Sequence, residues 1–125
     1  MSDLKENIIK EKSYKFALRI VKLYKYLCEE KKEFVISKQL LRAGTSIGAN
    51  IEEAVGAITK KDFLNKIFTS YKEARETKYW IKLLEDSGYI DSKEANSILN
   101  DCEDILRITG KIISTSKLNR LTKNT

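Results

Sequence analysis

The side chains that could do chemistry in this sequence are mainly carboxylates, cations and two cysteines, and the chain has no histidine. Histidine is the commonest general base and the commonest imidazole metal ligand, so most catalytic templates are excluded. Glu53, Glu73 and Glu76 come nearest to a carboxylate metal site. A di-iron site in a helical bundle also needs Glu-x-x-His motifs, and these are missing. We therefore expect no enzyme activity, no metal and no cofactor.

The cysteines and glycines suggest packing more than chemistry. Cys28 and Cys102 lack CxxC spacing and lie among apolar neighbours, which predicts reduced core thiols in a cytosolic protein. Gly44 and Gly48 are followed by no Lys-Ser/Thr pair of the kind that ends a phosphate loop. Each costs about 1 kcal/mol in a helix relative to alanine, so we expect a neighbouring backbone or a partner to approach closely there.

Basic side chains dominate the charge, with 24 Lys and Arg against 18 Asp and Glu and a net charge of +6. Such a balance favours an anionic partner, RNA or DNA before a membrane surface. The first basic zone consists of Lys12, Lys15, Arg19, Lys22 and Lys25. The second, within an acid-free C-terminal segment, contains Arg107, Lys111, Lys117 and Arg120. We expect both zones to contact phosphates, and charge alone leaves ordinary solvation equally open.

Other polar residues recur at helical spacing. Arg42, Ser46, Asn50 and Glu53 align as one stripe, and Glu73 and Glu76 lie three apart further along the chain. These groups could form a recognition surface. Internal bracing of two helices is the favoured interpretation, because polar groups inside bundles are usually hydrogen-bonded to one another.

Tyr79 and Trp80 are adjacent in a helical segment, so one should face the core and the other a groove or a neighbour. A nucleic-acid base could stack on the outer ring. Packing in the core or at a subunit contact is favoured, because a single pair lacks the repeated spacing of a stacking platform.

Four amphipathic segments must position these side chains. Apolar spacings of three and four predict helices at about residues 4–32, 37–56, 60–87 and 92–116, with the remaining C-terminal residues frayed. Ser37, Thr59 and Asp91 are the expected N-caps, and Gly88 is the expected left-handed residue after the third helix. Long helices joined by short loops predict an all-α, antiparallel up-down-up-down four-helix bundle, with residues 1–125 as a single domain.

The first helix has more apolar surface than one bundle interior needs. Its core stripe is expected to include Ile8, Phe16 and Ile20, and Leu18 and Tyr26 widen the apolar arc beyond that stripe. We expect a homo-oligomer in which this arc is a subunit contact, and favour it over coverage by the rest of the chain. The N-terminal residues show no signal-peptide core, which predicts a cytoplasmic protein without membrane contact.

A resemblance to a known family covers about residues 13–90. It rests on the runs FALRIVKLYKYL, SKQLLRAGTSIGANIEEA and KKDFLNKIFTSYKEARETKYWIKLLEDSGYI. Its strongest part is SIGANI with Glu53, followed by Asp62-Phe63, Glu73-Ala74, Glu76-Thr77 and Tyr79-Trp80. In order and spacing these runs resemble the four-helix bundle proteins encoded in intervening sequences of bacterial 23S ribosomal RNA genes. The pattern is specific for that family and not for an activity.

The resemblance implies a small basic bundle that assembles as a ring, with pentamers among relatives. It also implies kinship with the accessory variability protein of diversity-generating retroelements, which binds nucleic acid and a reverse transcriptase. We therefore expect a non-enzymatic homo-oligomer that binds RNA or other nucleic acid through its basic surfaces. The alternative is a protein-interaction scaffold that docks a partner such as a reverse transcriptase.

Overall fold

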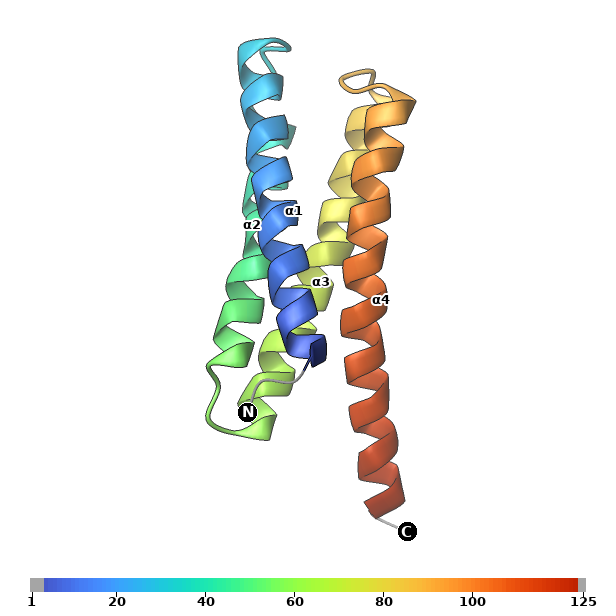
Figure 1. The fold of residues 1–125 in the computed structure, drawn as a ribbon. Coiled ribbons are helices and arrows are strands. Elements are labelled where there is room, and N and C mark those ends of the chain that lie inside the picture. Colours follow the sequence, from blue (N-terminus) through green and yellow to red (C-terminus); the bar gives the residue numbers. More distant parts are fainter. Residues whose placement is uncertain (1–3, 124–125) are drawn as a thin grey trace.

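A computed structural model describes residues 4–123, apart from the side chains of residue 5 and of residues 118–123. Within 4–123 the chain forms the helices α1 (Leu4–Glu29), α2 (Ile36–Val55), α3 (Lys60–Asp86) and α4 (Ser92–Lys123), with no strand. Consecutive helices pack antiparallel, and α1 also contacts α4, so each helix has two neighbours (Figure 1). The predicted up-down-up-down four-helix bundle is confirmed.

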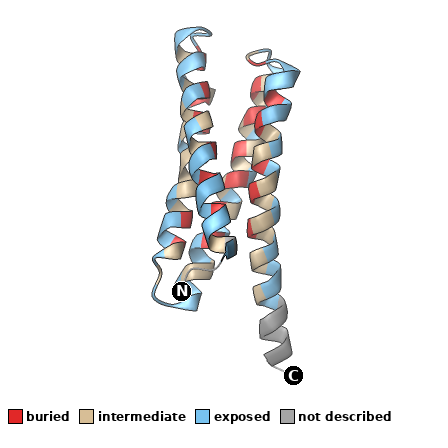
Figure 2. Ribbon diagram, viewed as in Figure 1, coloured by how far each residue is buried: buried red, intermediate tan, exposed pale blue. Residues whose placement is uncertain are grey.

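One apolar core runs along the inside of the bundle, where the buried positions of the helices face one another (Figure 2). Its largest fully buried side chains are Phe16, Ile9, Ile20, Leu27, Leu40, Ile47, Ile51, Ile67, Ile81, Leu84, Ile98 and Ile105. Burying a side chain of this size contributes roughly 1.5–3 kcal/mol. The spacing of three and four that predicted the helices is therefore the spacing of the core.

The start of α1 differs from the sequence prediction. Ile8 is 39% exposed, whereas Ile9 and Ser13 are buried. Ile9, Ser13, Phe16 and Ile20 follow one another at steps of four, three and four, and Ile8 lies one residue, about 100° of rotation, away from that line. The buried Ser13 hydroxyl is satisfied because it donates to the carbonyl of Lys10 at 3.1 Å.

The small residues of α2 bring it close to α1. A Cβ atom built on Gly48 would lie 3.3 Å from the backbone oxygen of Ser13. One built on Gly44 would lie 2.8 Å from both γ carbons of Ile20. The expected close approach at these glycines is confirmed, and the approaching element is α1 of the same chain.

Two of the three predicted caps are confirmed. The hydroxyl of Thr59 accepts the N–H of Asp62 at 3.1 Å, and the carboxylate of Asp91 accepts the N–H of Glu94 at 2.8 Å. Gly88 has φ +83°, the left-handed conformation that glycine adopts without strain.

The prediction that Ser37 caps α2 is wrong, because the helix begins at Ile36 and Ser37 already lies in its first turn. The carboxylate of Glu33 takes that role. It accepts the N–H of Val35 and of Ile36, each at 3.1 Å, and that of Ser37 at 2.6 Å. Burial tends to raise the pKa of Glu33, but these N–H donors outweigh it and the pKa is lowered.

The predicted fraying after residue 116 is also wrong, because α4 continues to Lys123. No glycine or proline follows Gly110, so no helix breaker interrupts the last turns. The C-terminal part of α4 extends beyond the ends of its neighbours (Figure 1).

Candidate nucleic-acid interface

Arg19, in the middle of the predicted basic zone of α1, is occupied by contacts to α4. Its guanidinium donates to Asp101 at 2.7 Å and to the hydroxyl and carbonyl of Ser97 at 3.0 and 3.3 Å. Glu94 lies 4.0 Å away. Arg19 therefore fastens α1 to α4, and most of its donors are already used.

The lysines of this zone fall into two groups. Nζ of Lys12 lies 3.7 Å from the carboxylate of Asp104, and Nζ of Lys15 lies 2.8 Å from the carboxylate of Glu11. Lys22 and Lys25 are exposed and form no ion pair within the described residues. The predicted five-residue zone thus leaves two free cations.

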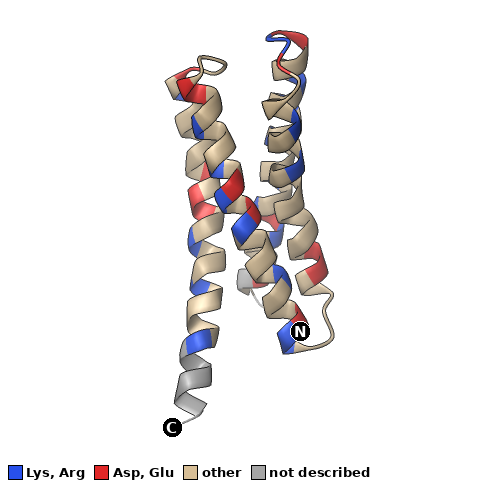
Figure 3. Cartoon of the chain, turned by 180° about the vertical axis from the view of Figure 1, so that it is seen from behind, with Lys and Arg blue, Asp and Glu red and all other residues tan. Residues whose placement is uncertain are grey.

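The C-terminal zone also leaves two cations free in its described part. Arg107 pairs with Asp104 at 2.9 Å, whereas Lys111 and Lys117 are exposed and form no ion pair in the described part of α4. The side chain of Arg120 lies outside the described residues. Seen from behind, this part of α4 carries Lys and Arg without Asp or Glu (Figure 3). Because α1 and α4 are antiparallel, the free lysines of α1 lie toward the opposite end of the bundle (Figure 1).

A further basic surface lies between α3 and α4. It is a groove of about 990 Å³, which we call the α3–α4 groove. Its lining residues are Tyr71, Arg75, Lys78, Tyr79, Lys82, Glu103, Leu106, Arg107, Gly110 and Ser114. Its lining thus includes several cations and one carboxylate, that of Glu103. A hydrogen bond from Lys78 to Glu103 at 2.6 Å neutralises that carboxylate and raises the pKa of Lys78.

The α3 side of this groove was not among the basic zones predicted from the sequence. Arg75, Lys78 and Lys82 are spaced three and four apart, which places them on one face of α3 and was visible in the sequence. Their position beside Arg107 was not visible, because it depends on how α3 packs against α4. Tyr79 is 59% exposed and Trp80 packs against the core, as predicted for that pair.

A smaller hollow, of about 530 Å³, lies between α1 and α4 near Arg19 and Lys22. Asp91 and Glu94 also line it, so its charges balance. It offers less to a polyanion than the α3–α4 groove.

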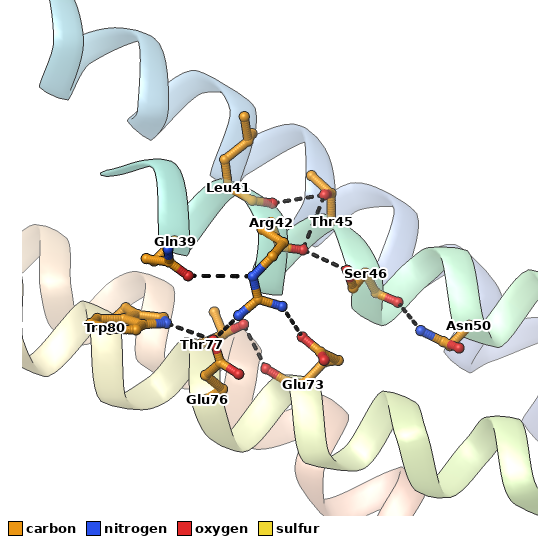
Figure 4. Close-up of polar contacts among 10 residues, drawn as sticks. All are labelled: Gln39, Leu41, Arg42, Thr45, Ser46, Asn50, Glu73, Glu76, Thr77 and Trp80. Atoms are coloured by element: carbon orange, nitrogen blue, oxygen red, sulfur yellow. Dashed lines mark hydrogen bonds and ion pairs between the residues drawn. The ribbon is translucent and has the colours of Figure 1, made fainter. Parts of the chain in front are cut away.

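The residues of the predicted polar stripe form two groups in the structure, of which one bridges α2 and α3. Arg42 bridges α2 to α3, donating to Glu73 at 3.2 Å and pairing with Glu76 (Figure 4). Glu76 also accepts the indole N–H of Trp80 at 2.9 Å, and Gln39 accepts from Arg42 at 3.4 Å. These contacts within the chain support the bracing interpretation for Arg42, Glu73 and Glu76.

Ser46, Asn50 and Glu53 take no part in that bridge. The hydroxyl of Ser46 donates to the carbonyl of Arg42 at 2.6 Å, and the amide of Asn50 donates to the carbonyl of Ser46 at 2.8 Å (Figure 4). Both bonds return to the helix's own backbone one turn earlier, a local alternative open to short polar side chains. Glu53 is exposed and forms no ion pair among the described residues.

The two thiols differ. Cys102 is buried, donates to the carbonyl of Ala74 at 3.3 Å, and has its pKa raised by burial to about 12. So little thiolate excludes a nucleophilic role at neutral pH. Cys28 is only half-buried, so its predicted core position is met in part.

Within the described residues, no three His, Cys, Asp or Glu side chains gather as a metal site. None of the helices in the same part of the chain is long and apolar enough to cross a membrane.

These features define a basic four-helix bundle protein in which α1, α3 and α4 each present exposed cations that form no ion pair among the described residues. The chain belongs to the 23S rRNA-intervening sequence protein family, whose model matches residues 5–111. This confirms the family resemblance and extends it into α4.

The chain is similar to a protein of unknown function from the S23 ribosomal protein family of Bacteroides thetaiotaomicron VPI-5482, known from a crystal structure at 1.70 Å. The two are 51% identical with a TM-score of 0.87, over 89% of this chain and 99% of that one. No curated protein matches the chain.

Proposed function

We propose that this protein binds RNA or another nucleic acid through phosphate contacts, as a cytoplasmic homo-oligomer without enzyme activity. The observation that carries the proposal is the uneven neutralisation of its cations. Acidic neighbours take up Lys12 and Arg19, whereas Lys111 and Lys117 project from an acid-free, fully helical stretch of α4. Unpaired cations along a helix are suited to a phosphate backbone and give little sequence preference.

Self-association is supported by the outer face of α1. Tyr14 is 65% exposed and Leu18, one turn further along the helix, is 55% exposed. Exposed apolar side chains that lie close together are typical of subunit contacts. A ring would repeat the +6 charge around an axis, and the family resemblance favours a pentamer. We also propose that the protein is related to the accessory variability protein of diversity-generating retroelements.

The test combines light scattering with fluorescence anisotropy of a labelled ribosomal RNA fragment. The variant Lys111→Gln/Lys117→Gln should weaken binding and reduce the slope of log affinity against log salt by about 1.4 to 1.8, because each lost phosphate contact contributes roughly 0.7 on single strands and 0.9 on B-DNA. The control Lys38→Gln/Lys66→Gln removes the same charge from exposed lysines of α2 and α3 that form no ion pair in the described chain. It should change both quantities less.

Two results would contradict the proposal. The first is that the wild-type protein does not bind RNA at low salt. If such a protein still assembles as a ring, the scaffold alternative is favoured. The other is a strict monomer. The variant Leu18→Glu tests the assembly directly and should shift the scattering mass toward the monomer while leaving helicity intact.

A further inference from the structure

We propose that the α3–α4 groove binds an unpaired, single-stranded segment of nucleic acid, with Tyr79 stacking on a base and Arg75 and Lys82 contacting phosphates. This inference rests on the proposed nucleic-acid function and assigns to it a site, a ligand form and a base contact.

The charge of the groove is the first argument. Arg75 and Lys82 are exposed and form no ion pair within the described residues. The single carboxylate of the lining, on Glu103, is already held by Lys78 at 2.6 Å. A ligand that enters the groove therefore meets free positive charge and no free negative charge. Such a surface is complementary to phosphates.

The spacing of the two free cations suits two phosphates of one short strand segment. Arg75 and Lys82 are seven residues apart on α3, which is about 10 Å along the helix axis. An unpaired strand spaces its phosphates more widely than the roughly 3.4 Å axial rise of a strand in a duplex, so the two cations span at most about three nucleotides. Arg107 of α4 lines the same groove from the other side.

The aromatic ring distinguishes this groove from a general anion site. Tyr79 lies between Arg75 and Lys82 in the sequence, lines the groove and is 59% exposed. Base–aromatic stacking contributes binding energy that an acidic peptide cannot obtain from the same ring. Nucleic acid is therefore favoured over an acidic protein as the occupant.

The ring is also held in place. Tyr79 meets Trp80 edge to face, with ring centroids 5.0 Å apart and an interplanar angle of 73°. The indole N–H of Trp80 is fixed by Glu76 at 2.9 Å, and Glu76 in turn pairs with Arg42 (Figure 4). A ring that is ordered before binding loses less entropy on stacking. Arg42 and Glu76, which brace α2 against α3, thus also position Trp80 and, through it, Tyr79.

An exposed ring favours unpaired bases because a duplex hides the faces of its bases in its own stack. Single-stranded segments can turn a base outward onto an aromatic side chain. The groove should therefore prefer a single strand over a duplex of the same length, although the duplex carries more charge.

Fluorescence anisotropy with a labelled oligouridine, and with an RNA duplex of equal length, tests the inference. The variant Arg75→Gln/Lys82→Gln should lower the salt slope for the single strand by about 1.4, at roughly 0.7 per phosphate. The charge-matched control Lys38→Gln/Lys66→Gln should leave that slope near the wild-type value. Circular dichroism and thermal unfolding establish that each variant is folded.

Tyr79→Ala separates stacking from charge. It should weaken oligouridine binding by roughly 5- to 150-fold, the range measured for loss of one stacked base, and should leave duplex binding nearly unchanged. Tyr79→Phe keeps the ring and should bind like the wild type.

The inference is overturned if the wild type binds RNA while Arg75→Gln/Lys82→Gln and Tyr79→Ala bind as well as it does, which would place the interface elsewhere and leave the proposed function intact. It is also overturned if a polyglutamate peptide competes equally well and with the same dependence on Tyr79. A wild-type protein that binds no nucleic acid at low salt overturns both proposals together.

Discussion

A methyl group added at Gly44 should destabilise the bundle, whereas the same addition at Gly110 should stabilise it. Both glycines lie inside helices. At Gly44 the new Cβ would lie 2.8 Å from Cγ1 and Cγ2 of Ile20, which is fully buried. At Gly110 it would lie 3.5 Å from Cε2 of Tyr71, an ordinary van der Waals contact.

The magnitudes follow from two opposing terms. Alanine is favoured over glycine in a helix interior by about 1 kcal/mol at both positions. Overpacking a filled core costs about 1–3 kcal/mol, and it applies only at Gly44. Ile20 cannot turn aside easily, because its β-branched side chain is restricted and its surroundings are closely packed. Gly44→Ala should therefore lie about 1–3 kcal/mol below Gly110→Ala in stability, and the shared helix-propensity term cancels in that difference.

Urea unfolding followed by circular dichroism measures this difference. All variants should be compared at one protein concentration, because self-association would make stability depend on concentration. Gly110→Ala should unfold at a higher urea midpoint than the wild type. If Gly44→Ala is as stable as Gly110→Ala, then the contact with Ile20 yields at little cost, and the explanation given for the glycines of α2 is wrong.

Further predictions concern the caps, the α2–α3 bridge and the thiols. The pKa of Glu33 is lowered in the folded state, so its ionised carboxylate stabilises the fold. This contribution to the free energy of unfolding should be complete above the ordinary glutamate pKa of roughly 4.3 and should be lost as pH falls through the folded-state pKa. Glu33→Gln should remove this pH dependence from urea midpoints measured at acidic and neutral pH. Thr59→Ala should lower the free energy of unfolding by about 1 kcal/mol in the same assay, and Thr59→Ser should restore most of it. Arg42→Gln should lower the free energy of unfolding by about 1 kcal/mol or less at low salt, because the bridge from Arg42 to Glu73 and Glu76 is half-exposed. Added salt should reduce the difference in stability between the variant and the wild type. A difference that does not change with salt would argue against an electrostatic bridge. In a Cys28→Ala variant a thiol-specific reagent should leave Cys102 unmodified in the native protein and react with one thiol per chain in urea, whereas rapid native modification would contradict its burial and raised pKa.

Most of the fold could be predicted because its signals are local. Helical spacing located the four helices, and the caps at Thr59 and Asp91 depend on residues three positions away. The exceptions have local explanations too. Glu33 caps α2 in place of Ser37, because its carboxylate accepts three N–H groups from a position before the first turn. No capping pattern in the sequence indicated this role for Glu33.

The candidate interface was predicted less well. The sequence identified Lys22, Lys25, Lys111 and Lys117 as basic, and they stay exposed. It could not show that Arg19 is occupied, because its partner Asp101 lies 82 residues away. The free charge of a surface depends on which acids pack beside it, and that is a property of helix contacts.

By itself the sequence determined the number and order of the helices, the caps at Thr59 and Asp91, the excess of positive charge and the family, because each is encoded in residue types and short-range spacing. The tertiary structure alone decided which cations remain unpaired and that Arg75, Tyr79 and Lys82 share a groove with Arg107. The physical reason is distance. Ion pairs and grooves form between side chains a few ångströms apart in space, and residues from different helices come that close only when the bundle packs.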